Sequence, residues 1–252
     1  MKLRWDGARF EPSEEPGDIR IIDSWLTAEG HVRALDAHAR RFSISCAELF
    51  GLTAERTSEF VLTAAALSPV TGRWFPRVEL ALVSGEPRLQ VWVRPAPPVS
   101  RSVRLWLPGI PDARTCPRVK GPDLDWLTGL RQAAVAAGAD EAVLLSPAGH
   151  VLEGTSTSLL WWRGATLCAP PPDAAVLPGV TRSMLLAEAA DVAFENVGPA
   201  ELSGLEVWSV NALHGIRPVT GWVGAAIEAG TAARWAASPR PLLDHAQGNP
   251  LL

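Results

Sequence analysis

Apolar, β-forming residues come in short runs through the first hundred residues, and polar turns containing glycine, at residues 28–30 and 84–86, separate several of these runs. Runs bounded by such turns are typical of strands in hairpins. A helical segment lies between the first and second runs, with Asp36 as its expected N-cap and Gly51 as its expected end. The pattern predicts a small α+β layer, with strands at residues 19–26, 60–67, 78–83 and 89–93 and a helix at residues 35–50.

A proline-rich segment, residues 94–122, follows this layer and contains one clear strand at residues 102–107. Because proline fixes φ and has no backbone donor, such a segment is suited to cross between two substructures. We expect a small α/β N-terminal domain at residues 1–109, a linker at residues 110–118 and a larger C-terminal domain at residues 119–252.

The apolar pattern changes to a helical period after Pro122, which occupies an expected first helical position. The predicted helix ends at Gly138, and its apolar stripe consists of Leu124, Leu127, Leu130, Ala134 and Ala137. The pattern beyond it predicts a hairpin at residues 142–145 and 150–153, a strand at residues 158–162 and a helix at residues 180–192. Lys120 would thus lie just before a helix, and Glu153 at the end of a strand.

Composition narrows the classes of function. A chain of 252 residues with 47% hydrophobic residues can bury a core, whereas a net charge of −4 and no basic run longer than Arg40–Arg41 predict no nucleic-acid partner. The absence of a long apolar stretch predicts a cytoplasmic protein with no membrane partner. The three cysteines are widely spaced without paired histidines, so we expect neither a disulfide framework nor a metal site.

Lys120 stands out because Lys2 is the only other lysine in the chain. The remaining basic residues are arginines, whose guanidinium group does not lose a proton near neutral pH. A lysine in an ordered position can instead form a Schiff base with an aldehyde. The simpler interpretation is a solvated surface lysine, which is the usual fate of this residue type.

Glu153 precedes a run of small hydroxyl residues, and Thr157 and Ser158 are the last two of them. One interpretation is a Ser/Thr turn that satisfies its own backbone. The other is a set of donors around a cofactor ring, with the carboxylate keeping a pyridine nitrogen protonated so that the ring can accept electrons.

The turn at residues 177–181 opens the last predicted helix. It can be a Pro-Gly turn that caps the helix. It can also bind an anion, because the amides of Val180 and Thr181 and the Thr181 hydroxyl would point from a helix start. Arg41 is a candidate cation for the same anion. An amine, a carboxylate and a phosphate site are the three parts that pyridoxal 5′-phosphate (PLP) requires, and the chain contains them in one order.

The combined motifs resemble those of the fold-type IV PLP-dependent enzymes, or class IV aminotransferases, a family that includes branched-chain and D-amino acid aminotransferases and aminodeoxychorismate lyase. The resemblance covers residues 20–222 approximately. Its motifs here are His38 with Arg41, Phe42 and Ser45; Glu153 and Gly154 with Thr157 and Ser158; the complete Leu177–Arg182 match; and residues 210–219, which are similar to the family's closing active-site loop.

The resemblance implies an α/β (α+β) fold with a small two-layer N-terminal domain and a larger barrel-like C-terminal domain, and it implies a homodimer. It assigns the Schiff base to Lys120 and contacts with the cofactor phosphate to Arg41, Val180 and Thr181. Further contacts with the cofactor are expected from Glu153, Thr157, Ser158 and Ala212, and contacts with the substrate from Asn211 and Leu213.

Three departures from the family pattern concern the contacts with the cofactor and the substrate pocket. Thr157 and Ser158 replace the serine and asparagine of the family's E-G-x-x-S-N run, and Ala212 replaces a serine or threonine that contacts phosphate in many members. The chain also contains no tyrosine, so the known branched-chain and D-amino acid pockets do not transfer to it.

Three hypotheses about function follow. The first is a transaminase that moves an amino group between an amino acid or primary amine and a 2-oxo acid. The second is aminodeoxychorismate lyase, which releases pyruvate and 4-aminobenzoate; Asn211 followed by Ala212 and Leu213 is similar to the lyase motif, although Asn211 can equally bond its own backbone. The third is a non-catalytic protein that binds a phosphorylated ligand at Val180 and Thr181.

Overall fold

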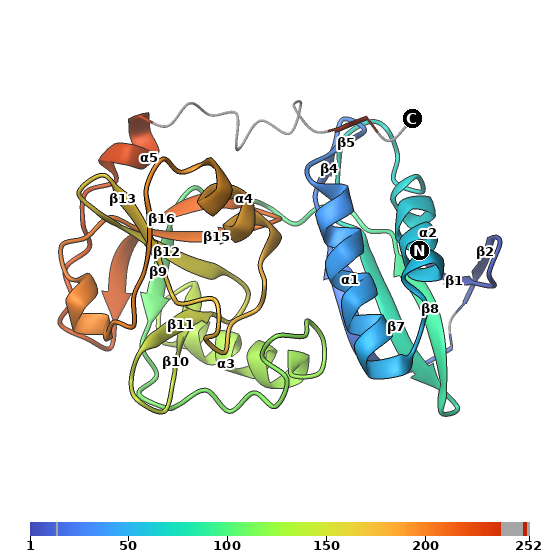
Figure 1. Cartoon of the computed structure of the whole chain (residues 1–252), viewed down its shortest axis with the longest axis horizontal. Coiled ribbons are helices and arrows are strands. Elements are labelled where there is room, and N and C mark those ends of the chain that lie inside the picture. Colours follow the sequence, from blue (N-terminus) through green and yellow to red (C-terminus); the bar gives the residue numbers. More distant parts are fainter. Residues whose placement is uncertain (14, 238–248, 251–252) are drawn as a thin grey trace. The chain divides into compact units, whose positions relative to one another are not determined.

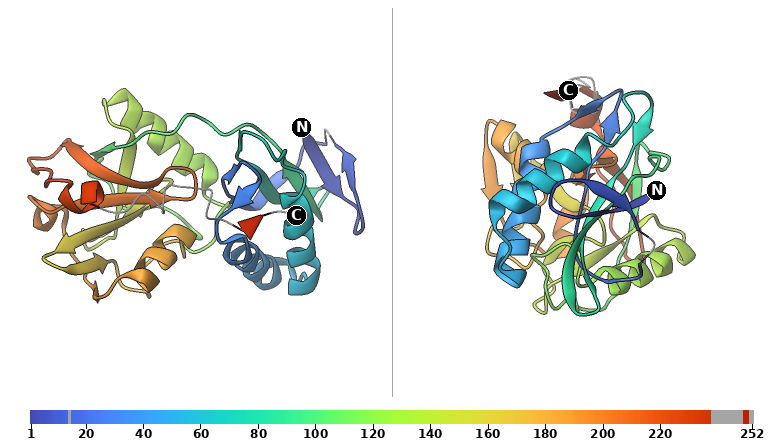
Figure 2. Two further views of the ribbon diagram at one scale, coloured as in Figure 1. Left: turned by 90° about the horizontal axis from the view of Figure 1, so that it is seen from above. Right: turned by 90° about the vertical axis from the view of Figure 1, so that its right-hand side faces the viewer.

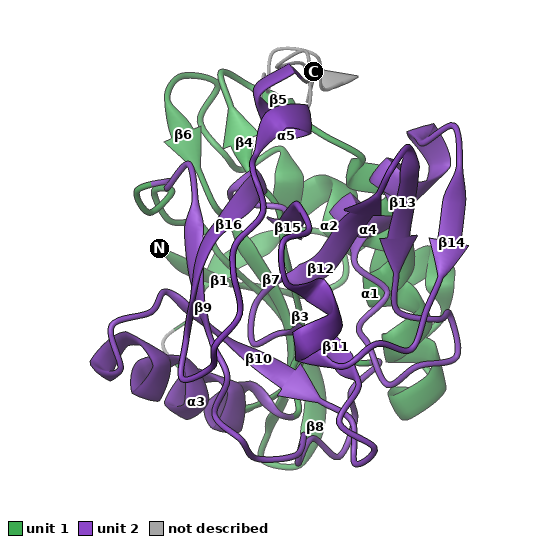
Figure 3. Cartoon of the chain, turned by 90° about the vertical axis from the view of Figure 1, so that its left-hand side faces the viewer, with its two compact units in different colours: residues 1–98, 119–122, 244–252 green, residues 99–118, 123–243 purple. Residues whose placement is uncertain are grey.

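The computed structural model describes residues 1–13, 15–237 and 249–250, and the chain divides into two compact units (Figures 1 and 3). Unit 1 contains residues 1–98 and 119–122 and the described C-terminal pair, whereas unit 2 contains the described residues 99–118 and 123–237. This division begins before the expected linker at residues 110–118, which belongs to unit 2. The four residues around Lys120 belong to unit 1.

Unit 1 is built on an antiparallel five-stranded sheet with the order β2-β1-β8-β7-β3. Its strands are β1 (Lys2–Trp5), β2 (Phe10–Pro12), β3 (Asp18–Ser24), β7 (Arg77–Val83) and β8 (Glu86–Trp92). A second small sheet has the order β17-β5-β4-β6 and consists of β4 (Thr27–Ala28), β5 (His31–Val32), β6 (Arg73–Trp74) and β17 (Asn249–Pro250).

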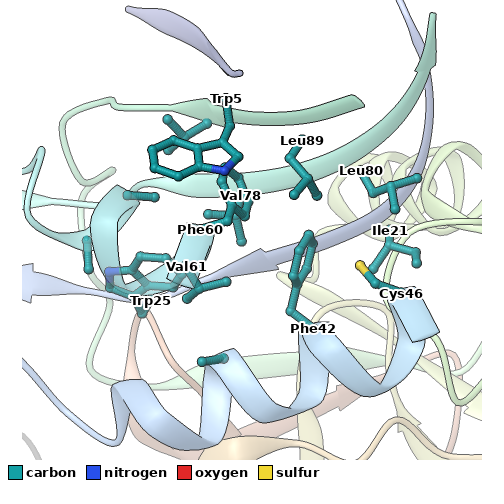
Figure 4. Packing of buried hydrophobic residues seen from close by; sticks show 14 of the residues in the cluster. Trp5, Ile21, Trp25, Phe42, Cys46, Phe60, Val61, Val78, Leu80 and Leu89 are labelled. Carbon is teal, nitrogen blue, oxygen red and sulfur yellow. The ribbon is translucent and has the colours of Figure 1, made fainter. Parts of the chain in front are cut away.

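Helices α1 (Leu35–Phe50) and α2 (Ala54–Ala65) lie side by side against the five-stranded sheet and form the second layer of unit 1 (Figure 2). The core of this layer consists of large apolar side chains from both helices and from alternate positions of the strands (Figure 4). Phe42 of α1 and Phe60 of α2 have ring centroids 5.9 Å apart within it. Burial of these side chains is the main force that joins helices to sheet.

The predicted strand at residues 60–67 is wrong, because residues 54–65 form helix α2. Thr53 caps this helix, since its hydroxyl accepts a hydrogen bond from the Arg56 amide. Phe60 and Ala64 are buried while Leu62 is half exposed, which is a helical and not an alternating pattern. Short apolar runs are ambiguous between strand and helix unless the residues before them are included.

Unit 2 is built on a closed barrel. Six strands form it, because β11 pairs with β12 as well as with β10: β9 (Val103–Trp106), β10 (Glu141–Leu145), β11 (Val151–Gly154), β12 (Ser158–Arg163), β15 (Val207–Asn211) and β16 (Gly215–Val223). Strand β9 runs parallel to both of its neighbours, and the other barrel pairs are antiparallel. Strands β13 (Thr166–Ala169) and β14 (Val192–Phe194) extend the sheet beyond β12.

The helical elements of unit 2 are α3 (Leu124–Ala136), α4 (Val180–Glu188), the 3₁₀ turn η1 (Pro199–Leu202) and α5 (Ala233–Ala237). Helix α4 ends earlier than its predicted boundary at residue 192, because Val192–Phe194 pair with β13 as strand β14. The two-layer unit and the barrel confirm the predicted fold class.

Candidate active site

Lys120 lies in the four-residue segment that packs on strand β3 of unit 1. Its carbonyl oxygen accepts a hydrogen bond from the Ile22 amide at 2.7 Å. Gly121 follows with a φ of +144°, and a Cβ atom there would lie 2.5 Å from the Arg20 carbonyl oxygen. Only glycine permits so close an approach to β3. The backbone of Lys120 is therefore fixed against β3. A lysine that only interacts with solvent at the surface does not require such a fixed backbone.

The next residue of β3, Asp23, is fully buried and pairs with two cationic or potentially cationic side chains of α1. Its carboxylate accepts hydrogen bonds from Arg41, through Nε at 2.9 Å and Nη2 at 2.8 Å, and lies 2.8 Å from Nδ1 of His38. Burial by itself would raise the pKa of Asp23, but the Arg41 and His38 charges outweigh it and lower the pKa below its usual range. Arg41 is thus held by an ionised carboxylate.

Two consecutive residues of strand β3 in unit 1 therefore hold the two candidate residues: one contacts the candidate Schiff-base lysine and the next contacts the candidate phosphate-binding arginine. Lys120 is fixed through Ile22, and Arg41 is fixed through Asp23. The motif with His38 and Arg41 three positions apart on one helical face suggested the arginine but not its carboxylate partner, which precedes the helix.

Glu153 is buried at the end of β11, in unit 2. One of its oxygens accepts a hydrogen bond from Arg114 Nη1 at 2.7 Å and another from the Leu177 amide at 2.8 Å. Arg114 also binds Asp112, with Nη2 2.8 Å from a carboxylate oxygen, and the Ala175 carbonyl at 2.8 Å. These contacts fix the position of the Glu153 carboxylate.

Glu153 also closes the barrel, since the pair Glu153↔Ser158 joins β11 to β12. The residues between them form a tight turn, in which the Gly154 amide donates to the Thr157 carbonyl at 2.8 Å. The Thr157 hydroxyl is buried and has no hydrogen-bond partner among the residues that the structure describes. A buried hydroxyl normally has a partner, so this one fits an acceptor group of a ligand.

The Ser158 hydroxyl lies against the start of α4. A Cβ atom on Gly179, the N-cap of this helix, would lie 2.6 Å from Ser158 Oγ. The amides of Val180 and Thr181 are in the first turn, where no helical carbonyl is available to them. Unit 2 thus brings together Glu153, Thr157, Ser158 and the helix start of Val180 and Thr181, which fit the ring nitrogen and phosphate of a phosphorylated pyridine cofactor.

Three arginines hold the loop that leads into α4. Arg118 donates to the carbonyls of Pro172 and Ala174, Arg182 donates to that of Pro170, and Arg114 donates to that of Ala175. Burial lowers the pKa of Arg182, and the Glu153 charge offsets part of this effect. The sequence analysis did not predict these contacts. The run of three prolines before α4 is a signal that could have indicated them. Because proline has no backbone N–H, the carbonyls of such a run need hydrogen-bond donors from other segments.

Asn211 lies at the end of β15, where the turn to β16 begins. Its side-chain oxygen accepts hydrogen bonds from the amides of Leu213 and His214, at 3.1 and 2.8 Å, and its Nδ2 donates to the Ser156 carbonyl at 3.3 Å. These are the local backbone bonds that the sequence allowed as one interpretation of Asn211. Ala212 and Leu213 form the same half-buried turn.

None of the described helices combines the length and apolar character that crossing a membrane requires. Within the same residues, His, Cys, Asp and Glu side chains form no group of three that could hold a metal ion.

Comparison with known proteins agrees with this fold. The family model for amino-transferase class IV matches residues 20–222, and the chain therefore belongs to the class IV aminotransferases. It is accordingly a PLP-dependent enzyme, a transaminase or a lyase.

Individual relatives are distant. The structure is similar to a branched-chain aminotransferase from Thermoproteus uzoniensis, with a TM-score of 0.83, 18% identity and coverage of 99% of each chain. It is also similar to the PLP-bound form of a hypothetical aminotransferase from Mycobacterium tuberculosis, with a TM-score of 0.77, 21% identity and coverage of 98% of each chain.

Among curated proteins, the aminodeoxychorismate lyase of Bacillus subtilis is 33% identical over 85 residues. The match covers 32% of this chain and 29% of the lyase, so the chain matches less than a third of that protein's length.

Proposed function

We propose that this protein is a class IV transaminase that moves an amino group between an amino acid or primary amine and a 2-oxo acid. The observation that carries the proposal is the buried Glu153 carboxylate, fixed by Arg114 and the Leu177 amide at the closing pair of the barrel. A protein that only binds a phosphorylated ligand needs an anion site but has no use for a buried carboxylate beside it.

The candidate residues have distinct roles in this proposal. Lys120 holds PLP through its ε-amine, and Arg41, Val180 and Thr181 bind its phosphate, with the Thr157 and Ser158 hydroxyls as additional donors. Glu153 keeps the ring nitrogen protonated. When bound, PLP supplies an electron-accepting ring that makes the substrate's Cα proton acidic. The substrate amine would displace the Lys120 amine from PLP, and the freed Lys120 amine would accept the proton from the Cα atom and deliver it to the PLP carbon that had carried the lysine nitrogen, which is general acid–base catalysis by a lysine.

The lyase is the second candidate, supported by the 33% identity over 85 residues to the B. subtilis enzyme. The Asn211 geometry favours the transaminase, because the side-chain oxygen already accepts two backbone hydrogen bonds. An amide oxygen has two acceptor positions, so little capacity is left there for a substrate hydroxyl or carboxylic acid.

The first test is removal of the Lys120 amine. Borohydride reduction of the PLP-loaded wild-type protein should fix the cofactor on the peptide that contains Lys120, as mass spectrometry would show. K120A should lose both the visible absorption of lysine-bound PLP and the fixed mass. K2A is the matched control, since it removes the other lysine of the chain, and it should behave like the wild type. Visible absorption retained by K120A would contradict the proposal.

The second test separates the two reactions. Wild-type protein loaded with PLP is mixed with a panel of amino acids and amines, and separately with aminodeoxychorismate. A transaminase loses its visible absorption and accumulates pyridoxamine phosphate, whereas a lyase releases pyruvate and keeps its absorption. Light scattering would check the homodimer that the family resemblance implies.

A further inference from the structure

A buried carboxylate outside the recognised motifs, Glu141, holds the turn between the two strands that close the barrel. It is the first residue of β10 and is 1% exposed. The Thr155 hydroxyl donates to one of its oxygens, and the Ser156 hydroxyl donates to the other at 2.6 Å. Hydrogen bonds to an ionised, buried acceptor are among the stronger ones in proteins, so the tip of the turn is firmly attached to β10.

The backbone of the same turn is attached to β10 as well. The Thr155 amide donates to the Ala142 carbonyl at 3.1 Å. A Cβ atom on Gly154 would lie 2.8 Å from Glu141 Cγ and 2.5 Å from Thr157 Oγ1. The glycine after Glu153 is therefore required because the Glu141 side chain and the Thr157 hydroxyl pack directly over it.

The far end of the turn reaches the residues proposed to bind phosphate. Thr157 has the buried hydroxyl without a partner among the described residues, and the Ser158 hydroxyl lies against Gly179 at the start of α4. The Ser156 carbonyl accepts from Asn211, which in turn binds the amides of Leu213 and His214. A shift of the turn would therefore move two hydroxyls and release one contact of the β15–β16 turn.

We propose that Glu141 is a positioning residue, which aligns the Thr157 and Ser158 hydroxyls for the cofactor phosphate by holding the turn at residues 154–157. The inference rests on the proposed function, since it takes PLP as the phosphorylated ligand. Glu141 touches neither cofactor nor substrate in this role and acts through Thr155 and Ser156.

Glu141 also interacts electrostatically with Arg217, and the test must distinguish this effect from the hydrogen bonds that Glu141 makes with the turn. Burial lowers the pKa of Arg217, and the negative charges of Glu141 and Asp140 offset part of this effect. E141A removes both the hydrogen bonds and the charge that Arg217 senses. The double variant T155V/S156A removes the hydrogen bonds from the turn and keeps the charge.

The test measures binding of PLP and of pyridoxal, which lacks the phosphate, to the apo-protein by tryptophan fluorescence. E141A and T155V/S156A should each raise the dissociation constant of PLP about tenfold, as is typical when a supporting hydrogen bond behind a ligand-binding group is lost. The dissociation constant of pyridoxal should change less than about twofold, because the phosphate contacts are absent there. Combining E141A with T155V/S156A should add little, because all three side chains act through the same bonds.

E195A is the matched control. Glu195 is a carboxylate of the same unit that holds Arg163, Trp161 and Cys168, and none of these belongs to the turn. The control should lower the melting temperature without selective loss of PLP. Three outcomes would overturn the role of Glu141. The first is an equal weakening of PLP binding and pyridoxal binding, and the second is an effect of E141A that T155V/S156A does not show. The third is a selective loss of PLP binding in E195A.

The outcomes also separate this inference from the function on which it rests. Wild-type protein that loads PLP on Lys120, together with variants that bind PLP normally, would overturn the role of Glu141 alone. Wild-type protein that binds no PLP would overturn both. If E141A does not fold, T155V/S156A gives the same comparison with the buried charge still in place.

Discussion

Asp23 shows how one side chain sets the state of its neighbours. It is fully buried, and its two oxygens bind Arg41 and face His38. A carboxylate in such a place is tolerable only with cationic partners. Because the pair lowers the pKa of Asp23, folding favours the ionised form, and the resulting stability depends on pH.

We expect D23N to lower the free energy of unfolding at pH 7 by about 3–5 kcal/mol, since it removes the buried negative charge that pairs with Arg41 and faces His38. The stability that the ionised Asp23 contributes is present above the ordinary carboxyl pKa of about 3.9 and is lost as the pH falls through the lower folded-state pKa. The difference between wild type and D23N should therefore shrink as the pH is lowered from about 5. Urea denaturation at several pH values measures it.

D18N is the control for this prediction, because Asp18 is an exposed partner of Arg20 on the same strand. Loss of an exposed pair should cost less than about 1 kcal/mol. A D23N variant that is no less stable than D18N at pH 7 would show that the buried pair contributes nothing.

The position of helix α4 depends on a close packing contact at its N-terminus. The helix begins at Gly179, whose missing side chain leaves room for the Ser158 hydroxyl of β12. Its φ of −68° is one that any residue can adopt, so space and not backbone conformation requires glycine here. The other neighbours of a Cβ atom, at 3.5 and 3.8 Å, would be at ordinary contact distance.

G179A should therefore destabilise the apo-protein by about 1–3 kcal/mol, the usual cost of forcing an extra methyl group into a packed site. S158A in the same chain should recover most of this loss, because it removes the single atom that the new methyl group meets too closely. Thermal unfolding of the single and double variants measures both effects.

G129A is the matched control, since Gly129 lies inside helix α3 with open space around its Cβ position. This change should stabilise the protein by up to about 1 kcal/mol, because alanine is the better helix former. If S158A does not relieve G179A, the contact between β12 and the start of α4 is not the cause of the loss.

Across the whole molecule, the two units differ in how they are built and each contains a buried thiol. Cys46 lies in the helix–sheet core of unit 1, and Cys168, on β13, lies in an apolar core cluster of unit 2. Burial raises the pKa of the Cys46 thiol to about 12, and burial with the Glu195 hydrogen bond raises that of Cys168 to about 11. Cys116 is only half-buried.

Thiol labelling of the native protein at pH 8 should therefore modify Cys116 first, and Cys46 and Cys168 should react at least about a hundredfold more slowly. The thiolate is the reactive form, and in these two residues burial limits both access of the reagent and ionisation of the thiol. Partial denaturation should expose Cys46 with unit 1 and Cys168 with unit 2, which gives each unit its own reporter. Mass spectrometry of labelled peptides measures the rates. Rapid labelling of Cys46 in the native protein would contradict the packing described for unit 1.

The local sequence pattern was sufficient to predict those elements in which the hydrophobic period and the residues at the boundaries indicate the same structure. It predicted α1 with its end at Gly51, the strands within β7 and β8, and the hairpin of β10 and β11. The motifs also predicted the PLP-dependent family, because the chemistry of a cofactor demands particular residue types in a particular order. These features depend on interactions between residues close in the chain or on composition alone.

The tertiary structure decided the rest, because it depends on segments far apart in the chain. It ended α4 early by pairing Val192–Phe194 with β13. It also chose the partners of the predicted residues: Arg114 for Glu153, 39 positions away, and Asp23 for Arg41, 18 positions away. No local period encodes such pairs, since only the folded chain brings their charges together and removes them from water.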